Sequence, residues 1–122
     1  MVGLSGCPAY PWSAKRGFDP WHLAHLSDSM DDIATVRHKP VMIVETDWPQ
    51  AGTPSLAVGT PEFPFTPDGQ AQFYRALIHA VRTVPSSLRA GVAAWDVDTL
   101  PWACVFDSRG HALPTVRALG EP

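Results

Sequence analysis

The sequence predicts an α/β fold in which parallel strands alternate with helices. Short apolar segments of the kind that form buried strands alternate with longer segments whose apolar residues recur every three or four positions. Both longer segments also begin with a helix-capping residue followed by proline, at Asp19-Pro20 and at Thr66-Pro67. The resulting order of strand, helix, strand, helix and strand (βαβαβ) is typical of a parallel sheet with right-handed crossovers.

The first half of the chain contains two candidate strands with a helix between them. Residues 2–5 (VGLS) form the weaker strand candidate. The helix that follows is expected to end near Arg37. Residues 41–44 (VMIV) are apolar throughout and mostly β-branched, as in a central parallel strand that is covered on both faces. The apolar stripe of the helix consists of Leu23, Leu26, Met30 and Ile33.

The second half repeats this order after a long connection. Residues 49–65 are rich in Pro, Gly and Thr, and a connection of that length in a compact domain is usually functional or disordered. The second helix is expected to stop before Pro85. Residues 91–95 (GVAAW) then form a short buried strand, and residues 112–119 are expected to form a terminal helix. The apolar stripe of the second helix consists of Phe73, Tyr74, Leu77, Ile78 and Val81.

Length and composition limit the classes of function. With 122 residues the chain is expected to form one domain, and its net charge of −3 with scattered basic residues argues against a nucleic-acid partner. No apolar run of about 18 residues predicts a membrane span, and the amino terminus does not resemble a secretory signal. Cys7 and Cys104 are far apart in the sequence; a disulfide is possible, but two free thiols are the favoured interpretation.

Carboxylates follow two of the predicted strands directly. Glu45 ends the segment 41–44, and Asp96 ends the segment 91–95. In parallel α/β folds the loops at the carboxyl ends of the strands form the ligand site, while the strand interiors are packed. We therefore expect Glu45 and Asp96 to lie at a functional edge of the sheet, although a structural salt bridge is the alternative for a carboxylate in this position.

Several segments resemble the carboxyl-terminal third of the arabinogalactan endo-β-1,4-galactanases, the enzymes of glycosyl hydrolase family 53. The most specific are KPVMIVETDWP at 39–49 and FPFTPDGQAQFYRALIHAVRTVP at 63–85, followed by GVAAWD at 91–96. VGLSGCPAYPW at the start is similar to the family's sixth strand, and VFDSRGHALPTVRAL is similar to its closing segment. The resemblance covers nearly the whole chain.

This resemblance implies a partial (β/α)8 TIM barrel. Residues 1–122 would be the carboxyl-terminal part of one barrel domain and would supply strands six to eight with their helices. The implied activity is retaining hydrolysis of the polysaccharide β-1,4-galactan, with Glu45 of the VET motif as the nucleophile. The family's acid/base glutamate follows the fourth strand and has no counterpart here, so the isolated chain is expected to be inactive. Family members are usually secreted.

The eighth-strand motif departs from the family, which usually has Trp-Glu-Pro where this chain has Trp95-Asp96-Val97. Neighbouring strands lie about 4.8 Å apart, close to the separation of about 5–5.5 Å between the carboxyl groups of retaining glycosidases. Both Glu45 and Asp96 would, however, approach the sugar from the same side. Asp96 is therefore favoured as a contact to a sugar hydroxyl or as a structural hydrogen-bond partner, and Asp47 is expected to be solvated.

Three tryptophans occur at or just after the predicted strand ends, where an indole can stack on the apolar face of a sugar. They are Trp12, Trp48 and Trp95. A place in the core is the alternative for each, and it is strongest for Trp95 because this residue continues a strand. Trp12 and Trp48 are therefore the favoured substrate contacts.

Two hypotheses remain open. The chain is either a galactanase fragment that carries the nucleophile, or a noncatalytic carbohydrate-binding module that associates with itself or with a complementary barrel segment, because three parallel strands leave two edges unpaired. Neither hypothesis requires a metal or a cofactor. His22 and His25 share a helix face, but no third ligand is near them in the sequence.

Overall fold

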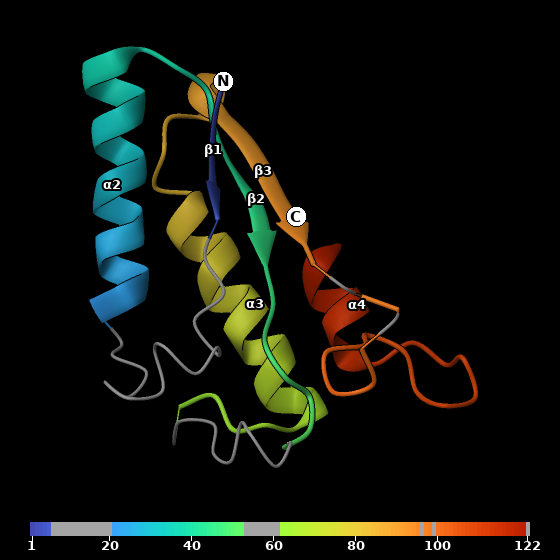
Figure 1. Cartoon of the computed structure of the whole chain (residues 1–122). Helices are drawn as coiled ribbons and strands as arrows, with labels where there is room; N and C mark the ends of the chain where they lie inside the picture. Colours follow the sequence, from blue (N-terminus) through green and yellow to red (C-terminus); the bar gives the residue numbers. More distant parts are fainter. Residues whose placement is uncertain (6–20, 53–61, 96, 99, 122) are drawn as a thin grey trace.

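The computed structural model describes residues 1–5, 21–52, 62–95, 97–98 and 100–121. It confirms the predicted order of elements (Figure 1). The strands are β1 (Val2–Ser5), β2 (Val41–Thr46) and β3 (Arg89–Ala94). The helices are α2 (Trp21–Arg37), α3 (Pro67–Val81) and α4 (Pro114–Leu119), with a 3-10 turn at Ser86–Leu88.

The three strands form one parallel sheet in the order β1-β2-β3. Val41, the first residue of β2, pairs with Val2 on one side and with Arg89 on the other. The amino ends of the strands therefore share one edge of the sheet and the carboxyl ends share the other. Figure 1 shows the strands pointing the same way, with α3 running beside them in the opposite direction, as a βαβ crossover requires.

One face of the sheet packs against the helices. Val41 and Ile43 of β2 are buried with Met30 and Ala34 of α2. Val92 of β3 contacts both this cluster and a second one, which is formed around the amino-terminal half of α3. The second cluster contains Trp48, Phe63, Phe73, Tyr74 and Leu77. The helix stripes predicted from the sequence therefore supply the core.

The start of α3 forms as its sequence predicts. Thr66 precedes the helix in an extended conformation, and its hydroxyl accepts a hydrogen bond of 3.0 Å from the backbone N–H of Gly69. Pro67 occupies the first helical turn, where its missing N–H is not needed. A Cβ at position 69 would collide with the carbonyl oxygen of Pro64, so this buried turn accepts only glycine. The corresponding start expected at Asp19-Pro20 lies outside the described residues.

The other face of the sheet is open in the described part of the chain. Val44 is 44% exposed, and Gly3 and Ser5 of β1 are exposed beside it. The apolar run 41–44 predicted a strand covered on both faces, but here the helices cover only one. Among the described helices, none is long and apolar enough to cross a membrane.

Candidate active site

A β-bulge turns the Glu45 side chain toward the open face. Leu4 pairs with Ile43, but the next residue, Ser5, pairs with Glu45, so that Val44 is an extra residue in β2. Ile43 packs against the helices, and by simple alternation Glu45 would do the same. The extra residue instead brings Glu45 to the side of the sheet on which Ser5 lies.

Ser5 holds the carboxylate in this position. Its hydroxyl donates a hydrogen bond of 3.0 Å to Oε2 of Glu45. Ser5 is the last residue of β1 and Glu45 is the second-last residue of β2, so both lie at the carboxyl edge of the sheet. Glu45 is half-buried, so its carboxylate is oriented yet accessible. Ser5 was missed at the sequence level, because only the shifted pairing of β1 with β2 shows that it faces Glu45.

Trp95 lies at the same edge of the sheet, directly after the end of β3. Its backbone N–H donates to the carbonyl of Thr46 at 2.7 Å, which continues the pairing of β2 with β3 beyond the end of the strand. Val92 and Ala94 contact the helix-side core, so alternation directs Trp95 to the open face. Its side chain is 48% exposed. The alternative of a core position, which the sequence supported most strongly for Trp95, is therefore wrong, and its indole is exposed at the same edge of the sheet as Glu45.

Trp48 lies in the core instead. Its side chain is 1% exposed and stacks on Phe73 at a ring separation of 4.6 Å, with the edges of Phe63 and Phe65 at 6.0 and 5.5 Å. An indole enclosed by three phenylalanines has no face left for a sugar. The expectation that Trp48 contacts substrate is corrected accordingly. Asp47 is also buried, at 1% exposure, where a solvated side chain was expected.

The other expected site residues lie outside the described residues. These are Asp96, which follows Trp95 directly, and Trp12 in the segment after β1. Cys104 is half-buried in the loop after β3, while Cys7 is not described, so the structure does not test their pairing. Among the described residues, no group of three His, Cys, Asp or Glu side chains is arranged to hold a metal ion.

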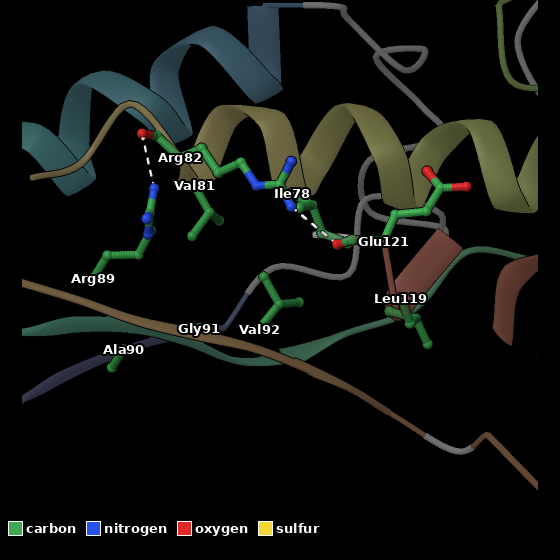
Figure 2. Close-up of a pocket in the computed structure, with 9 residues that line it drawn as sticks. All are labelled: Ile78, Val81, Arg82, Arg89, Ala90, Gly91, Val92, Leu119 and Glu121. Carbon is green, nitrogen blue, oxygen red and sulfur yellow. Dashed lines mark hydrogen bonds between the residues drawn. The ribbon is translucent and has the colours of Figure 1, made fainter. Parts of the chain in front are cut away.

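A pocket of about 410 Å³ lies at the opposite edge of the sheet (Figure 2). It is formed between the carboxyl-terminal end of α3, the first residues of β3 and the end of α4. Figure 2 shows Arg82 reaching toward Glu121, whose carbonyl accepts its hydrogen bond at 3.0 Å, and Arg89 bonded to the carbonyl of Arg82 at 3.1 Å. Arg82 thus anchors the end of the chain to α3 and Arg89 ties the start of β3 to the end of α3, away from Glu45.

Lowered pKa values occur at two exposed carboxylates, Glu121 and Asp107. The guanidinium of Arg75, bonded to both carboxylate oxygens of Glu121 at 3.0 and 3.1 Å, lowers the pKa of Glu121. The pKa of Asp107 is lowered chiefly by the backbone N–H of His111, and also by that of Arg109, each 2.8 Å from Oδ1. Both carboxylates are exposed; Glu121 follows α4, and Asp107 lies in the loop between β3 and α4.

The lowered pKa of Asp107 predicts a pH dependence of stability. Its contribution is complete above the ordinary value of 3.8 and is lost as the pH falls through the lower folded-state pKa, because protonation removes the charge that the two N–H groups stabilise. Asp107→Asn should lower the thermal unfolding midpoint slightly at neutral pH, and the difference from the wild type should shrink below that value. The exposed Asp28 of α2 supplies the control, Asp28→Asn. A difference for Asp107→Asn that stays constant down to strongly acidic pH would contradict this account.

The chain is similar to known proteins in both sequence and fold. The family model for glycosyl hydrolase family 53 matches residues 6–117. The chain is 35% identical to an arabinogalactan endo-β-1,4-galactanase of Cellvibrio japonicus and 31% identical to one of Thermothelomyces thermophilus, in each case over 79% of its own length. A solved fungal β-1,4-galactanase superposes on 98% of the chain with a TM-score of 0.75 at 24% identity. The chain covers only 25%, 27% and 37% of these three proteins, respectively.

Proposed function

Because the chain belongs to glycosyl hydrolase family 53, with the fold of part of a TIM barrel, we propose that Glu45 is the nucleophile of a retaining hydrolase that acts on β-1,4-galactan. The observation that carries this proposal is the bulge in β2, which turns Glu45 to the open face at the carboxyl edge and places it against Ser5. In a barrel, the open face of the sheet becomes the interior and the carboxyl edge becomes the rim of the active site.

The chemistry requires two carboxyl groups. The Glu45 carboxylate attacks the anomeric carbon and forms an ester to it while the bond to the departing sugar breaks. The oxygen of that sugar must receive a proton from a second carboxyl group, which then activates the water that hydrolyses the ester. In this family the second group follows the fourth strand, whereas β1 to β3 correspond to strands six to eight. We therefore expect residues 1–122 alone to hydrolyse galactan very slowly or not at all.

Other side chains at this edge are proposed to hold the sugar. Trp95 offers an exposed indole at the same edge of the sheet as Glu45, and Asp96 follows it directly in the sequence. A carboxylate at the edge of a sugar site can accept hydrogen bonds from ring hydroxyls. Trp12 remains a proposed stacking residue on the segment that follows β1.

A substrate whose leaving group departs without protonation can test whether Glu45 is the nucleophile even though the chain lacks the acid/base residue. A β-galactobioside with a dinitrophenolate leaving group, and with fluorine next to the anomeric carbon, needs no proton on the leaving group and forms a slowly hydrolysed ester. As dinitrophenolate departs, the bond from Glu45 to the anomeric carbon forms. Mass spectrometry of the digested chain should find the fluorinated disaccharide on the peptide that contains Glu45. A label on another residue, or no label, would refute the proposal for this chain.

The open face also supports a second candidate function. Val44 and Trp95 expose apolar surface on the side of the sheet that no described helix covers, and such a surface suits a noncatalytic module that binds galactan or pairs with a complementary barrel segment. The same experiment separates the two candidates. Galactan binding by a chain whose Glu45 stays unlabelled would favour the binding module.

Loss of the Ser5 hydroxyl should slow the chemical step. Ser5→Ala removes the hydrogen bond that orients Glu45 but leaves the strand and its pairing intact. We expect the limiting rate of labelling to fall roughly tenfold, the effect of one hydrogen bond to a charged group, with little change in the concentration that gives half of that rate. Ser5→Thr keeps the hydroxyl and should restore part of the rate. An unchanged limiting rate in Ser5→Ala would show that the contact does not orient the nucleophile.

A further inference from the structure

A buried amide lies behind the proposed site, at the amino-terminal end of α3. Gln70 is 0% exposed, and its amide nitrogen donates two hydrogen bonds, to the carbonyl of Trp48 at 2.8 Å and to the carbonyl of Ala103 at 2.9 Å. Its amide oxygen accepts a third, of 2.6 Å, from the hydroxyl of Thr115, which is also fully buried. The two donors and the acceptor of this side chain are thus all used.

These hydrogen bonds join segments that are far apart in the sequence. Trp48 lies in the loop after β2, three positions beyond Glu45, and Ala103 lies in the loop after β3. Thr115 belongs to the first turn of α4. Gln70 therefore fixes the two loops that follow β2 and β3, and it fixes them to α3 and α4 behind the carboxyl edge of the sheet.

A second glutamine joins the same two loops nearer the surface. The backbone N–H of Gln50 donates to the carbonyl of Trp102 at 2.6 Å, and its side-chain amide donates to the carbonyl of Pro101 at 2.7 Å. Gln50 is half-buried, so water can replace its side-chain bond. Water cannot reach the carbonyls that Gln70 satisfies without opening the core, so the rigidity of this junction depends mainly on Gln70.

We infer that Gln70 is a positioning residue that sets the spacing of the two loops at the sugar-binding edge. This inference rests on the proposed function of that edge. Gln70 does not reach the reacting atoms, because its three partners are the backbone of the loops and Thr115. Glu45 is held independently by the pairing of β2 and by Ser5. Gln70 should therefore govern how well the sugar binds, and not how fast the bound sugar reacts.

Gln70→Glu tests this division of roles. A carboxylate still accepts the hydrogen bond of Thr115 but cannot donate to the carbonyls of Trp48 and Ala103. In the labelling reaction, we expect the concentration of the fluorinated galactobioside that gives half of the limiting rate to rise at least about tenfold. The limiting rate itself should change by less than roughly threefold, because only binding is affected. Hydrogen exchange should speed up in residues 48–50 and 101–104 and stay unchanged in α2. Gln72→Glu is the matched control, since Gln72 is exposed on the same helix.

The possible outcomes separate a failure of the proposed function from a failure of the inference about Gln70. If the wild-type chain is not labelled, the proposed function fails, whatever the exchange data show for Gln70. If the wild type is labelled and Gln70→Glu reacts with the same concentration dependence, the inference about Gln70 is overturned. A fall in the limiting rate alone also overturns it. If circular dichroism shows that Gln70→Glu does not fold, Thr115→Val is used instead, because it removes only the hydrogen bond from Thr115 to Gln70. This variant should also raise the substrate concentration for half-maximal labelling, but by a smaller factor.

Discussion

Glu45→Gln is expected to abolish covalent labelling by the activated fluorinated galactobioside. The amide keeps the shape of the side chain and can still accept the hydrogen bond from Ser5, but it lacks the charge needed to attack the anomeric carbon. Removal of a covalent nucleophile typically lowers the rate by a factor on the order of 10⁴ or more, which places labelling below detection. Mass spectrometry of the intact variant, followed over the time in which the wild type reacts fully, makes the measurement.

The control for this variant is Glu62→Gln, which neutralises an exposed carboxylate in the connection between β2 and α3. It should be labelled at the wild-type rate. Circular dichroism should give the same spectrum and the same unfolding midpoint for wild type and Glu45→Gln, because Glu45 is only half-buried at the edge of the sheet. Undiminished labelling of Glu45→Gln would assign the reaction to another carboxylate and remove Glu45 from the mechanism.

Trp48→Ala should be the most destabilising of the tryptophan substitutions at the described positions. The indole is 1% exposed, stacks on Phe73 and contacts the edges of Phe63 and Phe65. Its removal leaves a cavity in the aromatic cluster, and truncation of a large buried aromatic side chain costs about 3–5 kcal/mol in the free energy of unfolding. For a domain of 122 residues this is a large share of the usual total of about 5–15 kcal/mol.

Trp95→Ala is the matched control, since it removes the same side chain from a position that is 48% exposed. Its cost should be about 1 kcal/mol or less, as for other substitutions outside the core. Urea unfolding followed by circular dichroism gives both values, because the change in midpoint reports stability when the slope is constant. Equal losses in the two variants would mean that Trp95 is as enclosed as Trp48, contrary to the structure.

The elements of the fold could be predicted because their signals are local. The cap at Thr66, the proline after it and the apolar stripe determine where α3 begins and which side it buries, and the structure confirms each of them. The family resemblance, carried by contiguous motifs such as 39–49 and 63–85, is confirmed by the match to residues 6–117. Both kinds of signal are read along the chain without knowledge of which strands are neighbours.

Trp48 is buried and Trp95 is exposed, although the sequence favoured Trp48 over Trp95 as a substrate contact. The reason is that both residues follow continuous apolar strands. Such a strand has no alternation of polar and apolar residues from which the direction of each side chain could be read. The sequence therefore could not show that Trp95 points away from the helices, or that the chain after β2 turns Trp48 into the aromatic cluster. The place of Glu45 depends in addition on an extra residue in β2, which only the pairing with β1 reveals.

The burial of Gln70 could have been predicted from the sequence. It occupies the same stripe of α3 as Tyr74, Leu77 and Val81, at spacings of three and four residues, so the helix pattern already placed a polar side chain on a buried face. A buried amide needs partners for its two donors and its acceptor. The sequence could not identify those partners, because the carbonyls of Trp48 and Ala103 come together only when both loops are folded.

Gly3 and Val44 are in close contact on the open face of the sheet. A Cβ on residue 3 would lie only 2.7 Å from Cγ1 of Val44. We expect the two positions to change together in evolution, because a larger residue at position 3 requires the side chain at position 44 to shift or to become smaller. Homologous sequences should therefore trade bulk between these sites, and a mutagenesis library built around the neighbouring carboxylate should randomise them as a pair.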